Sequence, residues 1–226
     1  MAINRVAQID RNIRVENVLI SVSDKQNLEI LVLGLLEINP HVQFYSTGGT
    51  YAQIQRILGE KATTNLIAVS EYTRQPEMQG GLVKTLDFKI YLGLLAETYN
   101  TAHVADLVRT KAVKMDMVIV NLYPFSKTIA NSDVTLEDAR GNIDIGGPCM
   151  LRAAAKNFIR VASVVDPLDY EIIIKELSVN VGEISFELRF RLAQKAFVHT
   201  SAYDTAIAKY LTDVSFQTAQ ETYNLV

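Results

Sequence analysis

The chain has very little cysteine and histidine, and no tryptophan. Cys149 is its single cysteine, which excludes an intrachain disulfide and a metal cluster built from cysteines. The three histidines, His41, His103 and His199, stand far apart and form no HxH or HExxH spacing. We therefore predict that the protein holds no metal ion.

The sequence also lacks an excess of positive charge and a long hydrophobic run. Its 22 lysines and arginines stand against 25 acidic residues, a net charge of −3 that argues against electrostatic binding to nucleic acid. The most apolar stretch, residues 28–38, is interrupted by Glu29, Gly34 and Glu37 and is too short to cross a bilayer. Residues 1–16 contain no apolar block of the kind that a signal peptide needs. We expect a cytoplasmic protein with no nucleic-acid or membrane partner.

What the sequence does have is the composition of an ordinary globular domain. Of its 226 residues, 49% are hydrophobic and 21% are charged. No internal repeat or low-complexity block divides the chain. We predict a single domain over residues 1–226, with a core at about 17–211, a flexible N-terminal segment and a loose C-terminal tail.

Strand and helix patterns alternate along the chain. Short apolar runs that predict buried strands occupy residues 18–22, 42–46, 66–69, 115–122 and 161–165. Helical spacing occupies residues 27–38, 51–58, 134–140, 149–158, 169–177 and 186–210, whereas residues 90–96 are either a strand or a buried segment. Continuous apolar strands between helices predict an α/β fold, a mainly parallel sheet with helices on both faces.

The turn at residues 46–50, Ser-Thr-Gly-Gly-Thr, is the clearest candidate for a ligand site. Ligands of open parallel sheets bind outside the carboxyl ends of the strands, where this turn is expected. Its two glycines let the backbone approach a ligand, hydroxyls flank them, and a helix N-terminus follows, so the turn is typical of a phosphate cradle. The alternative is a tight turn with a helix cap, which favours the same residue types.

Two further turns carry polar groups to the same predicted edge. Residues 21–25 bring two hydroxyls, a carboxylate and an ammonium, although Ser23 or Asp24 also fits a simple helix N-cap. Residues 142–148 place Gly-Gly before a helix and so expose backbone donors. Further along that helix Arg152 and Lys156 share one face, which equally suits a solvated basic stripe.

Lys84 and Thr85 follow a glycine pair in a region without periodicity, which suggests a loop near the ligand. Asn121 and Tyr123 end a buried strand and should emerge at the same edge. A tyrosine at a strand end is also common as a packed residue of the rim.

Together these motifs resemble the inosine monophosphate (IMP) cyclohydrolase domain of the bifunctional purine-biosynthesis enzyme, and they occur in that family's order over about residues 18–211. The matching segments are 21–25, 46–50, 76–78 (Pro-Glu-Met), 83–86 (Val-Lys-Thr-Leu), 121–125 (Asn-Leu-Tyr-Pro-Phe), 142–147 (Asn-Ile-Asp-Ile-Gly-Gly), 152–157 (Arg-Ala-Ala-Ala-Lys-Asn) and 195–200 (Lys-Ala-Phe-Val-His-Thr). The resemblance implies a methylglyoxal-synthase-like fold. It also implies the last step of purine synthesis, in which a formylated aminoimidazole carboxamide ribotide closes its ring and loses water to give IMP.

The family's second domain, a folate-dependent formyltransferase, has no counterpart in this sequence. We expect either a stand-alone cyclohydrolase, served by a separate formyltransferase, or a truncated chain. The resemblance further implies a homodimer and no cofactor.

By the same resemblance, two sets of residues form the site. The catalytic positions are Lys84, Tyr123, Asp144 and Lys156. The substrate and its phosphate are held by Ser21, Ser23, Lys25, Ser46, Thr47, Gly48, Gly49, Thr50, Thr85, Asn121, Ile145 and Gly146. In this hypothesis Lys84 or Lys156 stabilises the alkoxide, Asp144 accepts the nitrogen's proton or orients a lysine, and Tyr123 positions the formyl group. The backbone N–H groups of Ile145 and Gly146 supply an oxyanion site.

One segment departs from the family pattern. Where the family has Gly-Arg-Val-Lys-Thr-Leu-His-Pro, residues 81–88 read Gly-Leu-Val-Lys-Thr-Leu-Asp-Phe, so Leu82 removes a basic contact to an anion. This leaves open a second interpretation, a non-catalytic regulatory module that binds purine nucleotides. A third, a methylglyoxal-synthase-like phospho-lyase, rests on the phosphate turn alone.

Overall fold

A five-stranded parallel sheet forms the centre of the molecule in the computed structural model, which describes residues 5–75 and 84–224. The strand order is β4 (Leu66–Ala68), β3 (Gln43–Ser46), β2 (Asn17–Val22), β5 (Met117–Asn121) and β6 (Ala162–Val164). In the central register Val18 of β2 pairs with Phe44 on one side and Met117 on the other. The predicted α/β fold with a parallel sheet is confirmed.

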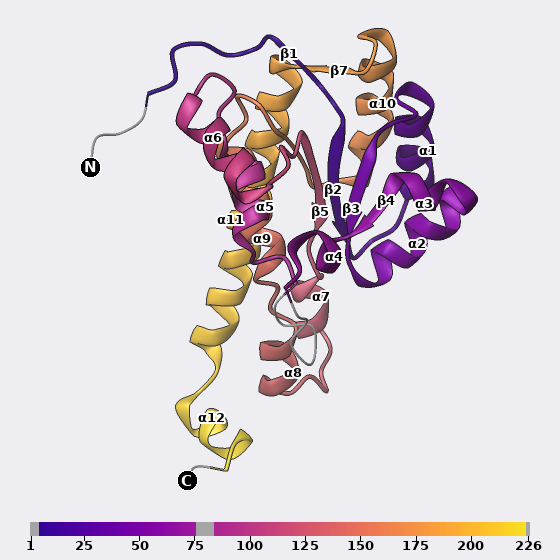
Figure 1. The fold of residues 1–226 in the computed structure, drawn as a ribbon. Coiled ribbons are helices and arrows are strands. Elements are labelled where there is room, and N and C mark those ends of the chain that lie inside the picture. The colour runs from indigo at the N-terminus through magenta and orange to yellow at the C-terminus, as the bar shows by residue number, and fades with distance from the viewer. Residues whose placement is uncertain (1–4, 76–83, 225–226) are drawn as a thin grey trace.

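Helices cover both faces of this sheet because its strands are apolar on both sides (Figure 1). Val18 and Ile20 of β2 face one core, and Leu19 faces the other. The first core packs against α1 (Leu28–Ile38), α2 (Gly48–Leu58) and α10 (Tyr170–Val179). The second packs against α5 (Phe88–Leu95), α9 (Gly146–Lys156) and α11 (Phe186–Asp213).

Shorter elements complete the described chain. They are the α-helices α3 (Ala62–Asn65), α4 (Val69–Thr73), α6 (Thr101–Thr110), α7 (Phe125–Ile129), α8 (Leu136–Gly141) and α12 (Phe216–Thr222), with 3-10 turns at Gly59–Lys61 and Pro167–Asp169. The strand β1 (Asn12–Arg14) pairs antiparallel with β7 (Glu183–Ser185) and ties the N-terminal segment to the start of α11. The tail beyond residue 211 includes α12, and after it the Tyr223 hydroxyl donates to Glu137 Oε2 of α8 at 2.5 Å.

The segment 90–96 and the starts of two helices near the site differ from the expectations. Residues 90–96 lie mostly in the helix α5. Asp87 caps the N-terminus of this helix, because its side chain accepts a hydrogen bond from the Lys89 N–H at 2.8 Å. The helices α2 and α9 begin at Gly48 and Gly146, about a turn earlier than predicted. In both cases glycines that look like loop residues form the first helical turn.

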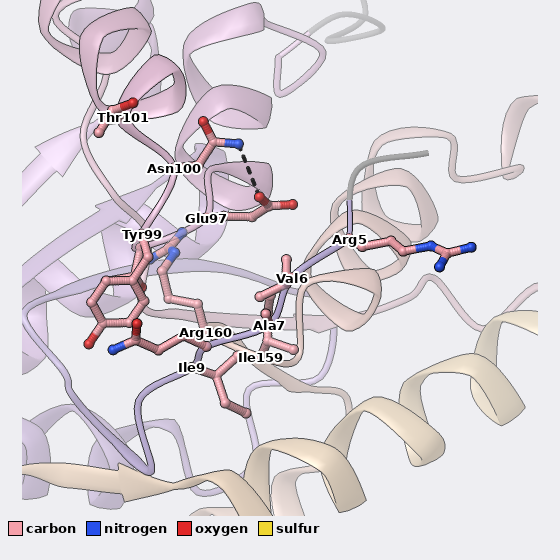
Figure 2. A pocket seen from close by; sticks show the side chains of 12 residues that line it. Arg5, Val6, Ala7, Ile9, Glu97, Tyr99, Asn100, Thr101, Ile159 and Arg160 are labelled. Atoms are coloured by element: carbon pink, nitrogen blue, oxygen red, sulfur yellow. Dashed lines mark hydrogen bonds between the residues drawn. The ribbon is translucent and has the colours of Figure 1, made fainter. Parts of the chain in front are cut away.

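A cavity of about 380 Å³ opens at the amino ends of the strands (Figure 2). Its walls come from residues 5–9, 97–101 and 159–160, the last of which directly precede β6. In its wall the Asn100 side-chain amide donates to Glu97 Oε2 at 3.2 Å. The predicted ligand turns at 21–25 and 46–50 follow the carboxyl ends of β2 and β3, so this cavity lies at the opposite edge of the sheet.

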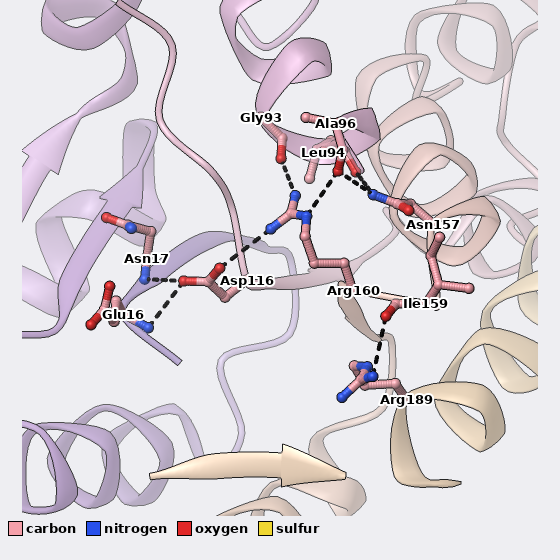
Figure 3. A network of polar contacts seen from close by, with 10 residues as sticks. All are labelled: Glu16, Asn17, Gly93, Leu94, Ala96, Asp116, Asn157, Ile159, Arg160 and Arg189. Carbon is pink, nitrogen blue, oxygen red and sulfur yellow. Dashed lines mark hydrogen bonds and ion pairs between the residues drawn. The ribbon is translucent and has the colours of Figure 1, made fainter. Parts of the chain in front are cut away.

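A buried polar network fixes the amino ends of the two central strands (Figure 3). Asp116, just before β5, accepts hydrogen bonds from the backbone N–H groups of Glu16 at 3.1 Å and Asn17 at 2.9 Å. Arg160 pairs with the same carboxylate at 3.3 Å and also donates to the carbonyls of Gly93 and Ala96. The network therefore sets the relative position of strands whose other ends carry the predicted site.

Candidate active site

The sheet has a topological switch point between β2 and β5. The chain leaves β2 toward α1 on one face and runs from β5 to α9 on the other. In open parallel sheets, ligands bind beside such a point at the carboxyl ends of the strands. Asn121, the last residue of β5, joins the end of this strand to the turn after β2. Its side-chain oxygen accepts the Asp24 N–H at 2.8 Å, and its amide donates to the Asp24 carbonyl at 2.8 Å.

The turn after β2 is thereby held beside the end of β5. Ser21 and Ser23 are half-buried there, and Lys25 is exposed, with its ammonium 3.4 Å from the Ser23 carbonyl. These three predicted phosphate contacts thus lie next to Asn121 at the switch point.

In the turn after β3, two hydroxyls bind the protein itself, whereas part of the backbone is exposed. The buried Ser46 hydroxyl donates to the Ile20 carbonyl at 2.8 Å. The Thr50 hydroxyl accepts the Val22 N–H at 3.1 Å and donates to the Val22 carbonyl at 3.0 Å. Both side chains bind β2, so what the turn presents to solvent is the half-buried Thr47 and the exposed glycines 48 and 49.

Gly48 has a positive φ of 49°, a conformation that side chains with a Cβ rarely adopt. The hydroxyl of Thr47 does not cap α2, so the helix begins with backbone N–H groups that no side chain at its N-cap satisfies. This is the arrangement expected of an anion site at the start of a helix.

Lys84 and Thr85 join this turn to the start of α9. A Cβ placed on Gly48 would lie 3.7 Å from the Lys84 Nζ, so the ammonium stands directly beside the glycine turn. A Cβ placed on Gly146 would lie only 2.5 Å from the Thr85 hydroxyl oxygen. Gly146 therefore lets the buried Thr85 approach the helix, and two consecutive residues link two turns that are distant in sequence.

Asp144 shapes the turn before α9. Its Oδ1 accepts the Gly147 N–H at 2.9 Å, and its own N–H donates to the Tyr203 hydroxyl at 2.7 Å. Burial raises the pKa of the Asp144 carboxyl above its ordinary value, while hydrogen bonds from the Gly147 and Gly146 N–H groups act in the opposite direction. Two backbone donors at the start of α9, the Gly147 and Gly146 N–H groups, are thus directed at the Asp144 carboxylate.

The other predicted site residues, Tyr123, Ile145 and Lys156, lie on the surface at different places. Tyr123 and Ile145 lie on the surface with exposed fractions of 58% and 57%. Lys156 is exposed in the last turn of α9, ten residues from Gly146 and hence about 15 Å along the helix axis. The fold therefore brings Lys84 to the glycine turn and Thr85 to the start of α9, but it does not bring Lys156 to this edge. The segment 76–78 and Leu82 lie outside the described residues.

Two features of the site were not anticipated from the sequence. One is the pairing of Asn121 with Asp24, and the other is Tyr203, which reaches the Asp144 turn from α11. Helical periodicity marks Tyr203 as a core residue and carries no signal for the second task of its hydroxyl.

No cluster of three or more His, Cys, Asp or Glu side chains suited to a metal ion occurs in residues 5–75 and 84–224. Within the same residues, none of the helices combines the length and apolar character needed to span a membrane.

The fold defines a protein class, an α/β protein built on a parallel sheet with a switch point between β2 and β5. The chain belongs to the family of MGS-like domains, whose family model matches residues 29–149, more than half of the chain. The model of the AICARFT/IMPCHase bienzyme matches residues 154–225.

Similar proteins point the same way. The bifunctional purine biosynthesis protein PurH of Bacillus cereus (strain ZK / E33L) is 47% identical over 204 residues, 90% of this chain and 38% of that protein. PurH of Bacillus anthracis (strain CDC 684 / NRRL 3495) is 46% identical over the same length. The crystal structure of ForH matches with a TM-score of 0.71 and 31% identity, covering 85% of this chain and 97% of the ForH chain.

The chain thus spans 38% of the length of the first of these curated relatives. The matches confirm the resemblance to the cyclohydrolase domain of the bifunctional purine-biosynthesis enzyme and its methylglyoxal-synthase-like fold.

Proposed function

We propose that this protein is an IMP cyclohydrolase of purine biosynthesis. In the proposed reaction the carboxamide nitrogen of the formylated ribotide attacks the formyl carbon, a tetrahedral alkoxide forms and is protonated, and the hydroxyl then leaves as water. The observation that carries the proposal is the position of residues 84–85, with Lys84 against the Gly48 turn and Thr85 against Gly146. An ammonium and a helix N-terminus thereby adjoin a phosphate-type turn.

The reaction needs little from the protein beyond orientation, because nucleophile and electrophile belong to one molecule. Holding the reactive rotamer is worth roughly 7–11 kcal/mol of the barrier. A preorganised donor to the alkoxide adds about 3 kcal/mol, and a positioned acid or base about 10²–10⁴-fold in rate.

The residues at this edge suit these tasks. The phosphate binds at the exposed backbone of residues 47–49, with Lys25 as a mobile counter-charge. Lys84 donates to the alkoxide, and the N–H of Ile145, just before α9, stabilises the same charge. Asp144 takes the proton from the nitrogen. Its pKa is raised above that of an exposed aspartate and so lies nearer to neutral pH, which suits a general base. Tyr123, exposed at the end of β5, orients the formyl group.

Lys156 has no part in this scheme within one chain, because it stands at the far end of α9. We further propose that the protein works as a homodimer in the cytoplasm on a substrate supplied by a formyltransferase. Its oligomeric state is measured by sedimentation.

The test is turnover of the formylated ribotide, followed by the ultraviolet absorbance of IMP, with the wild type and Lys84→Met. We expect turnover by the wild type and a loss of at least about 10²-fold in kcat for the variant. Lys61→Met, at an exposed lysine of the 3-10 turn Gly59–Lys61, is the matched control and should keep near-normal kcat.

Two outcomes would contradict the proposal. IMP binding without turnover would favour the regulatory module. Release of methylglyoxal from dihydroxyacetone phosphate, with no turnover of the ribotide, would favour the phospho-lyase.

A further inference from the structure

Tyr203 touches both chain segments that enclose the Asp144 side of the site. It lies on α11, is 9% exposed, and accepts the Asp144 N–H at 2.7 Å through its hydroxyl. Its ring meets the ring of Phe125 edge to face, with centroids 6.3 Å apart and planes at 70°. Phe125 begins α7, two residues after Tyr123, so one side chain contacts the segment after β5 and the turn before α9.

We propose that Tyr203 is a positioning residue that fixes the direction of the Asp144 carboxylate from outside the substrate site. This inference rests on the proposed function, because it assigns Asp144 its task. The Asp144 carboxylate binds the Gly147 N–H, and its backbone binds Tyr203, so two bonds at opposite ends of one residue set its orientation. If the Tyr203 bond is lost, the turn is held at one end only.

The chemistry of a tyrosine suits this task better than that of a phenylalanine. The phenolic oxygen is the acceptor for a part-buried backbone N–H, and an unsatisfied buried N–H is costly. Phenylalanine at position 203 keeps the ring contact with Phe125 and removes only the acceptor. The Asp144 turn then has to move to reach another acceptor, and the carboxylate moves with it.

Tyr210 provides a matched control on the same helix. Its ring also meets Phe125 edge to face, with centroids 5.9 Å apart and planes at 84°. It therefore shares the helix and the aromatic neighbour with Tyr203, whereas the bond to Asp144 belongs to Tyr203. Comparing Tyr203→Phe with Tyr210→Phe separates that bond from general packing.

The experiment measures two quantities on the full chain. For Tyr203→Phe we expect kcat to fall roughly tenfold to a hundredfold with KM changed less than twofold, since small misplacements of a reacting group have effects of this size. We also expect faster hydrogen exchange of the Asp144 amide, seen by NMR of the isotope-labelled chain. Tyr210→Phe should change neither quantity.

The outcomes distinguish this inference from the proposed function. Unchanged amide exchange at Asp144 in Tyr203→Phe overturns the positioning role whether or not the wild type has activity. Faster exchange with unchanged kcat also overturns it, since the bond would then be structural only. A wild type that turns over no ribotide contradicts the proposed function, while the exchange of the Asp144 amide still reports on the bond. An equal loss of kcat in Tyr210→Phe would assign the effect to packing on Phe125.

Discussion

Gly49→Ala separates ligand binding from folding at the glycine turn. A Cβ on Gly49 would meet no atom of residues 5–75 and 84–224 within 4 Å, and its φ is not positive, unlike that of Gly48. Because Gly49 lies in the first turn of α2, alanine fits the fold and restricts the unfolded chain. We expect the variant to gain about 0.4–1 kcal/mol in free energy of unfolding. For a chain of this size that corresponds to roughly 1–4 °C in Tm.

The same methyl group occupies space that the phosphate needs if it binds against this backbone. Losing one hydrogen bond from an N–H to a charged oxygen costs about 1.5–3 kcal/mol. We therefore expect KM for the ribotide to rise roughly 10- to 150-fold, because each 1.4 kcal/mol is a factor of ten. Thermal unfolding and the ultraviolet turnover assay measure the two effects on the same preparation.

Gly141→Ala is the control for this prediction. Gly141 ends α8, and a Cβ there also meets nothing within 4 Å in the part of the chain that the structure describes. It should stabilise the fold comparably and leave KM unchanged. A Gly49→Ala variant with wild-type KM would refute the placement of the phosphate against this turn.

Three further substitutions test the site and its support. Asp144→Asn should abolish turnover yet raise the free energy of unfolding at pH 7. Burial raises the pKa of the Asp144 carboxyl in the folded chain, so its ionisation opposes folding. Urea unfolding should show the stability difference between variant and wild type shrinking as the pH falls through that pKa. Asn121→Ala should cost about 1–2 kcal/mol by removing both bonds to Asp24 and should raise KM, measured by urea unfolding and steady-state kinetics. Arg160→Met should cost about 3–5 kcal/mol in the same unfolding assay, because Asp116 stays buried without its partner, while KM of the folded fraction is unchanged.

The strands of the sheet were predictable because each is a short, continuous apolar run. Residues 18–22 and 115–122 contain almost only large apolar side chains, and the structure buries them between two layers of helices. The α5 segment was ambiguous for the same reason, since a buried helix and a buried strand look alike over seven residues. Its start depends on Asp87, a cap that periodicity does not reveal.

The locations of the site's turns were predictable from the sequence, but the hydrogen bonds of their side chains were not. Topology places every turn that follows a parallel strand at one edge, so the positions of Gly48 and Asn121 followed from the strand pattern. The hydroxyls of Ser46 and Thr50 bind the backbone of β2. The sequence could not predict this, because such bonds depend on the distance between strands. Lys156 shows that closeness in sequence does not ensure closeness in space. It follows the Asp144 turn by only twelve residues, but it lies at the other end of α9.

The central claim is that turns distant in sequence form one site, and amide chemical shifts on titration with IMP test it most directly. The account predicts that the largest changes fall at residues 21–25, 47–50, 84–85, 121–123 and 144–147. Changes confined to the cavity of Figure 2, around residues 5–9 and 97–101, would contradict it, as would no change at saturating IMP.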